Sequence, residues 1–214
     1  IQNWIARTAK RIGEMIPEEA DEARRENLRA MHEANAWLVD HPPRTFLEAC
    51  QWLAWNNMAE RTYCRAGAGC QLDETLRPYY EADLAAGILD PDKAQYILAC
   101  LLNDPHYYQI GGPDEAGKDM TSELSFLILE AAHALKTTCN LTIRVHDGMD
   151  ERLFRRGLEI LLEDRKACPR FSGDNALVRG FMKNGYSAEL ARKRIAVGCN
   201  WMSLPGLEYT LNDL

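Results

Sequence analysis

Apolar residues recur at three- and four-residue steps along much of the chain, which is the spacing of one face of an α-helix. After Pro17, four apolar residues follow this spacing with mostly polar residues between them: Leu28, Met31, Ala34 and Leu38. Proline suits the first turn of a helix, because the N–H groups of that turn have no partner within the helix. The pattern predicts a helix that begins at Pro17 and ends before the His-Pro-Pro sequence at 41–43.

The same periodicity predicts further helices along the chain. Thr45 is a suitable cap for the first of them, because its hydroxyl can accept a hydrogen bond from a free N–H of the first turn. These helices are expected around 46–54, 72–84, 90–102, 124–135, 151–162, 175–183 and 188–194.

Three short segments instead carry the β-branched and aromatic residues that are typical of strands. They lie at 107–110, 141–145 and 195–197. No internal repeat and no low-complexity tract interrupts this order of elements. The pattern therefore predicts a mainly helical α/β unit that contains a few strands.

Composition narrows the class of protein. Of the 214 residues, 46% are hydrophobic, which is enough for a core, and the formal net charge of −7 argues against a general nucleic-acid binder. No segment approaches the roughly 20 apolar residues that span a bilayer, and no signal peptide opens the chain. The seven cysteines include no CxxC pair, which argues against a disulfide framework and a zinc site. We expect a cytoplasmic protein with neither a nucleic-acid nor a membrane partner.

The segment 112–119 nearly spells the phosphate-binding loop GxxxxGK[ST]. Asp119 occupies the position of the magnesium-binding hydroxyl, and Asp114 and Glu115 would place two negative charges beside a polyphosphate. The interpretation of this chain as a phosphate-binding NTPase would depend on this segment alone. The sequence favours an acidic loop that leads into the next helix, with Asp119 or Thr121 as the helix cap.

Cys199 follows the predicted strand at 195–197 and lies between Gly198 and the Pro-Gly pair at 205–206. Loops at the ends of strands commonly carry chemistry, whereas many cysteines are buried structural thiols, and the spacing alone leaves both interpretations open. No histidine follows Cys199, so ordinary Cys/His hydrolysis is not indicated.

Five blocks in the same order resemble the glycyl radical enzymes of the pyruvate formate-lyase-like group. They read RTFLEA at 44–49, LDETLRPYYEADL at 72–84, GPDEAGKDMTSELS at 112–125, NLTIRVH at 140–146, and GC at 198–199 with PG at 205–206. The resemblance implies that residues 1–214 are a mainly helical fragment of a ten-stranded α/β barrel. It also implies that Cys199 carries a thiyl radical, which abstracts a hydrogen atom from a small-molecule substrate.

In this family the thiyl radical arises from a glycyl radical near the C-terminus, which an S-adenosylmethionine-dependent iron–sulfur activase installs. The motif RVxGY that carries the glycyl radical does not occur in the 214 residues. The resemblance therefore implies an interior segment that binds no cofactor itself, lacks the glycyl radical domain and is inactive without it. The implied partners are the activase and a second copy of the chain in a homodimer.

The sequence departs from the dehydratase members where they carry an acid/base glutamate, two residues after the cysteine. That position is Trp201, and the adjacent second cysteine of pyruvate formate-lyase is replaced by Asn200. The resemblance places Arg65 and Asp213 at substrate-contacting positions, and Arg65 would bind a carboxylate. Neither diol dehydration nor acyl transfer between adjacent cysteines is therefore expected.

We expect instead a lyase or acyltransferase-like enzyme that makes or breaks a C–C or related bond of a carboxylated or aromatic substrate. The predicted site comprises the catalytic Cys199 and the substrate-binding residues Arg65, Asn200, Trp201 and Asp213. The alternative is a non-catalytic fragment or paralogue that retains only the scaffold. The absence of RVxGY from these residues is consistent with that alternative.

Overall fold

The computed structural model describes residues 1–60, 70–103, 106–135, 139–197, 201–204 and 207, without the side chains of Glu60 and Trp201. The helices in this part are α1 (Gln2–Met15), α2 (Glu22–Leu38), α3 (Phe46–Glu60), α4 (Leu72–Ala85), α5 (Pro91–Leu102), α6 (Glu123–Ala134), α7 (Glu151–Asp164), α8 (Asp174–Lys183) and α9 (Ala188–Arg192). The strands are β1 (Cys70–Gln71), β2 (Tyr107–Gly111), β3 (Asn140–Val145), β4 (Arg170–Gly173), β5 (Ile195–Val197) and β6 (Trp201–Ser203). A mainly helical α/β arrangement is thus confirmed.

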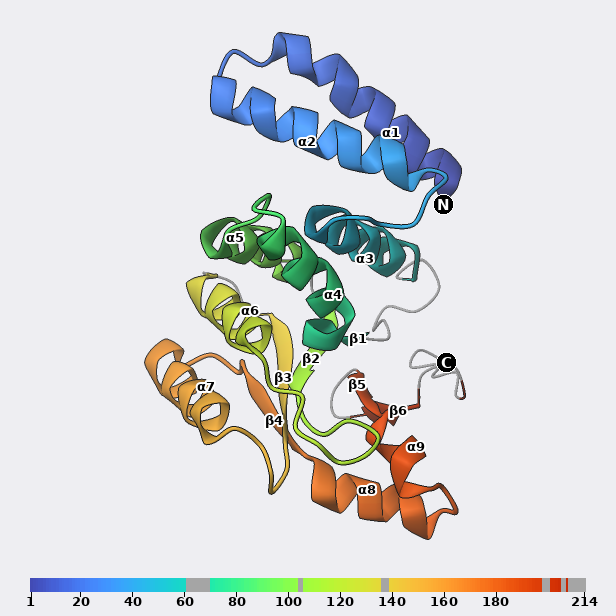
Figure 1. The fold of residues 1–214 in the computed structure, drawn as a ribbon, viewed down its shortest axis with the longest axis vertical. Helices are drawn as coiled ribbons and strands as arrows, with labels where there is room; N and C mark the ends of the chain where they lie inside the picture. Colours follow the sequence, from blue (N-terminus) through green and yellow to red (C-terminus); the bar gives the residue numbers. More distant parts are fainter. Residues whose placement is uncertain (61–69, 104–105, 136–138, 198–200, 205–206, 208–214) are drawn as a thin grey trace.

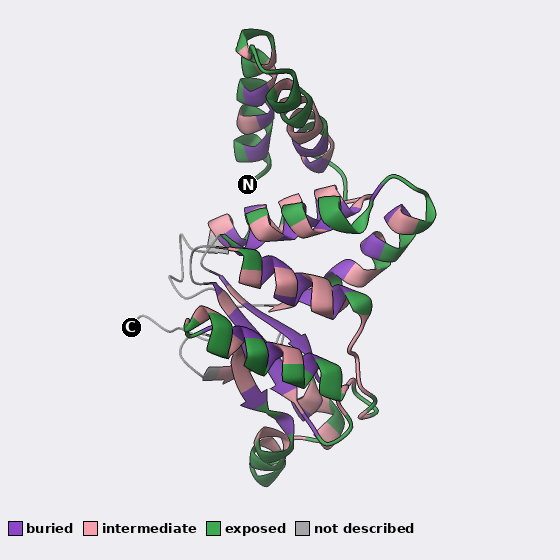
Figure 2. Ribbon diagram, turned by 90° about the vertical axis from the view of Figure 1, so that its left-hand side faces the viewer, coloured by how far each residue is buried: buried purple, intermediate pink, exposed green. Residues whose placement is uncertain are grey.

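Strands β1 to β4 form a parallel sheet in sequence order. Helices connect successive strands, as parallel pairing requires. Helices α4, α6 and α7 lie along one face of the sheet, and α3 and α5 pack behind them (Figure 1). Figure 2 shows that the strands are buried and that the outward sides of the helices are exposed.

The sheet is buried on both faces, but the two faces carry different side chains. Residues that alternate along a strand point to opposite faces. Tyr108 and Ile110 of β2, with Ile143 of β3, belong to the apolar core beneath the helices. Gln109 and Arg144 alternate with them and are equally buried. We call the apolar face with Tyr108, Ile110 and Ile143 the outer face. We call the opposite face, with Gln109 and Arg144, the inner face.

Strands β5 and β6 form a separate antiparallel pair on the inner side of the sheet (Figure 1). Their register joins Val197 to Trp201 and Ile195 to Ser203. We call this pair the hairpin. The sequence predicted β5 but neither β6 nor the short strands β1 and β4.

The N-terminal region differs from the sequence prediction. A helix from Pro17 was expected, but Pro17 lies in a 3₁₀ turn and α2 begins at Glu22. The reason is the capping carboxylate of Asp21, which accepts a hydrogen bond from the backbone N–H of Arg24 at 2.9 Å. Helix α1, which was not predicted, packs on α2 through buried Ile5 and Leu38.

Two helix caps show how local hydrogen bonding sets helix starts. Thr45 caps α3 as predicted, because its hydroxyl accepts a hydrogen bond from the N–H of Glu48 at 3.2 Å. The predicted cap of α6 by Asp119 or Thr121 is wrong, because Ser122 and Ser125 form a reciprocal capping box there. No helix in the described ranges has the length and apolar character needed to cross a bilayer.

Candidate functional site: the anchored hairpin

The two strands of the hairpin flank the segment in which the sequence predicts a reactive cysteine. Cys199 and Asn200 lie in the connection between β5 and β6, outside the described residues. The pairing of Val197 with Trp201 holds the two ends of that connection at adjacent positions. The contacts that hold the hairpin in place therefore also position both ends of this connection.

Gln109 of β2 binds the hairpin to the sheet through both ends of its amide. Its Oε1 accepts a hydrogen bond from the backbone N–H of Ala196 at 2.9 Å. Its Nε2 donates to the backbone carbonyl of Arg194 at 2.9 Å and to Oε1 of Gln71 at 2.8 Å. One buried side chain thus joins β1, β2 and the start of β5.

Asp174, at the start of α8, binds two buried arginines of the inner face. Arg144 donates to it from Nε at 3.1 Å and from Nη2 at 2.5 Å. Arg194 donates to the same carboxylate through Nη2, and its Nη1 lies 3.0 Å from the sulfur of Met202 in β6. These contacts fix both strands of the hairpin.

Asp174, Arg144 and Arg194 together carry one net positive charge, and all three side chains are buried. Burial and, to a smaller extent, the positive charge of Arg144 lower the pKa of Arg194 to about 10, although Asp174 opposes the shift. The guanidinium remains charged at neutral pH, because this pKa is still about three units above 7. Asp174 is therefore the anion that makes burial of both cations tolerable.

Asp73 connects the start of α4 to the carboxyl end of β2. Its carboxylate accepts hydrogen bonds from the N–H of Gly111 at 2.7 Å and from the hydroxyl of Ser125 at 2.6 Å. Gln71 donates to the other oxygen at 2.7 Å. Burial raises the pKa of Asp73, and these hydrogen bonds oppose the shift. The network therefore reaches from the hairpin to α4 and α6.

The loop that resembled a phosphate-binding segment is closed by its own contacts. Asp114 accepts a hydrogen bond from the N–H of Lys118 at 2.8 Å, and Pro113 pairs with Asp119. Asp119 also accepts a hydrogen bond from Nε2 of His146 at 2.9 Å. A side chain at Gly112 would meet Arg144 at 2.6 Å, so glycine is needed for this loop to pack on the inner face. The loop is a structural element of the inner face, as the acidic-loop interpretation predicted.

A cavity of about 230 Å³ adjoins the base of the hairpin. Its lining includes Gln71, Gln109, Arg144, Arg192, Arg194 and Ile195. Arg192 donates to the carbonyl of Glu115, and Lys193 forms an ion pair with the Glu115 carboxylate at 2.7 Å. The positive side chains of this cavity are thus paired within the protein.

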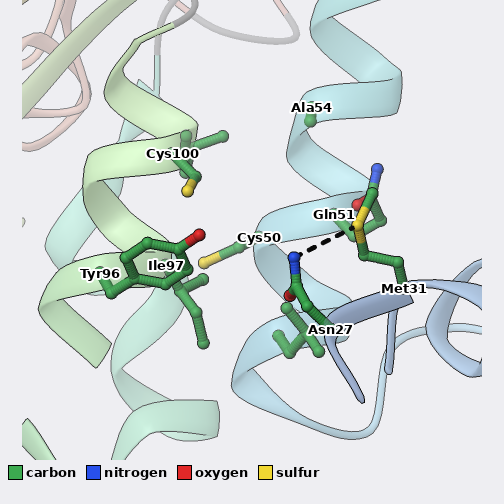
Figure 3. Close-up of a pocket in the computed structure, with 10 residues that line it drawn as sticks. Asn27, Met31, Cys50, Gln51, Ala54, Tyr96, Ile97 and Cys100 are labelled. Carbon is green, nitrogen blue, oxygen red and sulfur yellow. Dashed lines mark hydrogen bonds between the residues drawn. The ribbon is translucent and has the colours of Figure 1, made fainter. Parts of the chain in front are cut away.

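A second cavity, of about 220 Å³, lies among helices α2, α3 and α5 (Figure 3). Its lining is largely apolar and includes Met31, Cys50, Tyr96 and Cys100. Asn27 donates a hydrogen bond to the sulfur of Met31 at 3.9 Å across its edge. In the described part of the chain, His, Cys, Asp and Glu side chains form no group of three that could hold a metal ion.

The structure describes little of the site that the sequence predicted. Arg65, Cys199, Asn200 and Asp213 lie outside the described residues. Trp201 is described as the first residue of β6, without its side chain. The anchoring residues were missed: Gln109, Arg144, Asp174 and Arg194. Single polar residues within apolar strands, such as Gln109 and Arg144, are the signal that would have found two of them.

Comparison with known proteins supports the resemblance read from the sequence. The pyruvate formate lyase-like family model matches residues 1–213. The isethionate sulfite-lyase of Nitratidesulfovibrio vulgaris is 26% identical over 94% of this chain and 27% of its own length. The indoleacetate decarboxylase of Tractidigestivibacter scatoligenes is 31% identical over 101 residues, which are 46% of this chain and 11% of that protein.

A solved structure that describes 1,2-propanediol dehydration in Roseburia inulinivorans is also similar. It superposes with a TM-score of 0.87 at 25% identity, and the match covers 96% of this chain and 29% of that one. The chain therefore spans less than a third of the length of these relatives. Its fold is that of a mainly helical fragment of their α/β barrel. The chain belongs to the pyruvate formate lyase-like family of glycyl radical enzymes.

Proposed function

We propose that this chain is an interior segment of a glycyl radical lyase and that its hairpin presents Cys199 as the hydrogen-abstracting thiol. The observation that carries the proposal is the anchoring of both hairpin strands to the polar inner face of the sheet. Hydrogen-atom transfer requires the reacting atoms to be held close together and in a fixed orientation. An anchored hairpin meets this requirement for a residue in its connection.

In the proposed reaction, Cys199 first gives the hydrogen atom of its thiol to a glycyl radical carried elsewhere in the full-length protein. The resulting sulfur radical removes a hydrogen atom from carbon in the substrate, which regenerates the thiol and leaves the radical on the substrate. Each step breaks one bond to hydrogen and forms another, so no proton acceptor is needed.

We further propose that the bond acted on is a C–C or related bond of a small carboxylated or aromatic substrate. Trp201 stands where an acid/base glutamate would assist elimination, and Arg65 would bind a carboxylate. Partial similarity to a decarboxylase of indoleacetate, which is an aromatic carboxylate, supports this choice. Asn200, Trp201 and Asp213 complete the proposed substrate-binding residues.

The proposed partners are the small-molecule substrate, a radical-installing S-adenosylmethionine-dependent activase, and a second copy of the full-length protein in a homodimer. The family membership supports the activase, because glycyl radical enzymes depend on a radical that is installed after synthesis. The homodimer rests on the family resemblance alone.

The first experiment tests the role of Cys199 in the full-length protein under anaerobic conditions. The wild type and the C199S variant are treated with the activase, and the glycyl radical is measured by electron paramagnetic resonance. We expect both proteins to show the radical and only C199S to lose turnover by at least about 1,000-fold, because the thiol is part of every cycle. The matched control is C100S, which changes an exposed cysteine on α5.

Turnover that survives in C199S would refute the assignment of the thiol. Failure of the wild type to accept a radical would favour the non-catalytic alternative. A substrate panel then tests the reaction class. We expect carbon dioxide release or another C–C cleavage with arylacetates, and neither dehydration of propane-1,2-diol nor sulfite release from isethionate. Rapid turnover of either compound would overturn the proposed bond type.

A further inference from the structure

Two buried cysteines at the other end of the sheet face each other directly. Cys139 immediately precedes β3, and Cys168 lies two residues before β4. Their sulfur atoms are 3.2 Å apart, with exposed fractions of 3% and 5%. A disulfide bond is about 2.05 Å long, so the two sulfurs need to approach by only about 1.2 Å to be joined.

The surroundings make one sulfur of the pair the better nucleophile. The hydrogen bond shared with Cys139 lowers the pKa of Cys168, and burial opposes this shift. The N–H of Leu141 and the positive charges of Arg170 and Lys166 lower the pKa of Cys168 further. The same shared hydrogen raises the pKa of Cys139. Lys166 is held beside the pair by a hydrogen bond from Nζ to the carbonyl of Leu135 at 2.6 Å. The thiolate, and not the thiol, is the nucleophile that reacts with an oxidant, so a lowered pKa favours reaction at Cys168.

The backbone around the pair is already fixed in the arrangement that a crosslink needs. Strands β3 and β4 are direct neighbours, with Thr142 paired to Arg170. Ala132 of α6 and Ile160 of α7 close the space around the two sulfurs. The two cysteines therefore do not need a large rearrangement to react, but an oxidant reaches them only when this region opens.

We propose that Cys139 and Cys168 form an oxidation site that closes to an intramolecular disulfide. With a diazene oxidant, the Cys168 thiolate adds to one nitrogen of the N=N bond, and the other nitrogen takes a proton. Cys139 then attacks the sulfur of Cys168, the S–N bond breaks, and the departing nitrogen takes the second proton. Two thiols become one disulfide, and the diazene is reduced by two electrons to a hydrazine.

The crosslink would join the two strands that flank α7. The cysteines are 29 positions apart, so the closed loop contains β3 and α7. Closing a loop of this length restricts the unfolded chain and stabilises the folded state. The site does not depend on Cys199 or on radical chemistry, so it stands or falls separately from the proposed function.

The test uses the full-length protein that contains this chain, with diamide as the oxidant. After oxidation, free thiols are blocked with N-ethylmaleimide under denaturing conditions, and the protein is digested with trypsin. Cys139 falls in peptide 137–144 and Cys168 in peptide 167–170. We expect one linked species, two hydrogen atoms lighter than the sum of these peptides, which dithiothreitol separates. We also expect the oxidised protein to melt roughly 2 °C higher than the reduced protein, because the stabilisation is spread over a protein several times longer than this chain.

Two variants make the assignment specific. In C139S and in C168S the linked species and the rise in melting temperature should both disappear, whereas C100S should retain both. If a variant folds poorly, the presence or absence of the linked peptide in the wild-type protein still decides the proposal. Recovery of both peptides in blocked form, under conditions that oxidise the exposed Cys100, would overturn the proposal. So would a crosslink from either cysteine to a third one.

Discussion

The two faces of the β1–β4 sheet are buried to the same degree but are stabilised in opposite ways. On the outer face, Ile110 and Ile143 are 0% exposed and pack against helices. On the inner face, Gln109 and Arg144 are 1% and 2% exposed and are held by hydrogen bonds. Stability on the outer face follows the apolar area removed from water, whereas stability on the inner face depends on every polar atom having its partner. Substitutions should therefore have different consequences on the two faces.

The largest effect is expected on the inner face, at Asp174. In D174A, Arg144 and Arg194 would remain buried without their shared anion, and we expect a loss of about 3–5 kcal/mol in the free energy of unfolding. Urea unfolding followed by tryptophan fluorescence measures this loss. Addition of salt should not restore the stability, since the site is closed to solvent. A loss below about 1 kcal/mol would mean that the inner face tolerates an unpaired charge.

The matching change on the outer face is I143A. It deletes apolar atoms from a fully buried position, and we expect a loss of about 3 kcal/mol. Unlike D174A, this variant should keep the hairpin seated, so hydrogen exchange in β5 should be unchanged when measured under native conditions. Faster exchange there would show that the two faces are not independent.

A smaller effect tests how closely α7 packs on the outer face. A Cβ at Gly157 would lie 2.5 Å from Cδ1 of Ile143, so we expect G157A to cost about 1–3 kcal/mol of folding free energy. Ile143→Val removes that methyl group. In a double-mutant cycle, the cost of G157A should fall by about 1 kcal/mol or more in the I143V background. An unchanged cost would place the conflict elsewhere, for example at Phe171.

The smallest effect concerns Glu48, a buried carboxylate on the helical side of the molecule. Burial raises its pKa, but hydrogen bonds from the Arg44 guanidinium and from the N–H groups of Arg44 and Thr45 outweigh burial and lower it overall. Its stabilising contribution is therefore complete above the unfolded pKa of about 4.5 and is lost as the pH falls through the lower folded value.

We expect E48Q to lose about 1–2 kcal/mol of folding free energy at pH 7 and to converge with the wild type in acid. Unfolding measured between pH 7 and pH 3 tests this convergence. The matched control is E33Q, because Glu33 is exposed. A constant difference between E48Q and the wild type across this range would mean that the ionised form of Glu48 is not what stabilises α3.

Most helices and several strands could be predicted from the sequence, because they depend on local patterns of residues. Runs such as 141–145 have the composition of a strand, and the apolar spacing of α6 and α7 indicates helices directly. The short strands β1 and β4 escaped prediction because their pairing partners, rather than their composition, define them. The prediction that Cys199 is the reactive residue comes from the family resemblance and not from periodicity.

The anchoring network escaped prediction for a different reason. Asp174 opens α8 and reads as an ordinary acidic residue in a first helical turn. Only the fold brings it to Arg144 and Arg194, which are 30 and 20 positions away. Arg194 likewise reads as the basic end of a surface helix, yet it is fully buried. Contacts of this range leave no periodic trace in a single sequence.

The bond from Ala196 to the amide of Gln109 gives the molecule an internal reporter. The backbone N–H of Ala196 donates to a side chain of the sheet, so its deuterium uptake depends on contact between hairpin and sheet. Slow uptake at this one amide would mean that the hairpin is seated, and fast uptake that it has lifted, even when the rest of the protein stays folded. The position of the Cys199 connection can thus be followed in solution without labelling or altering the cysteine itself.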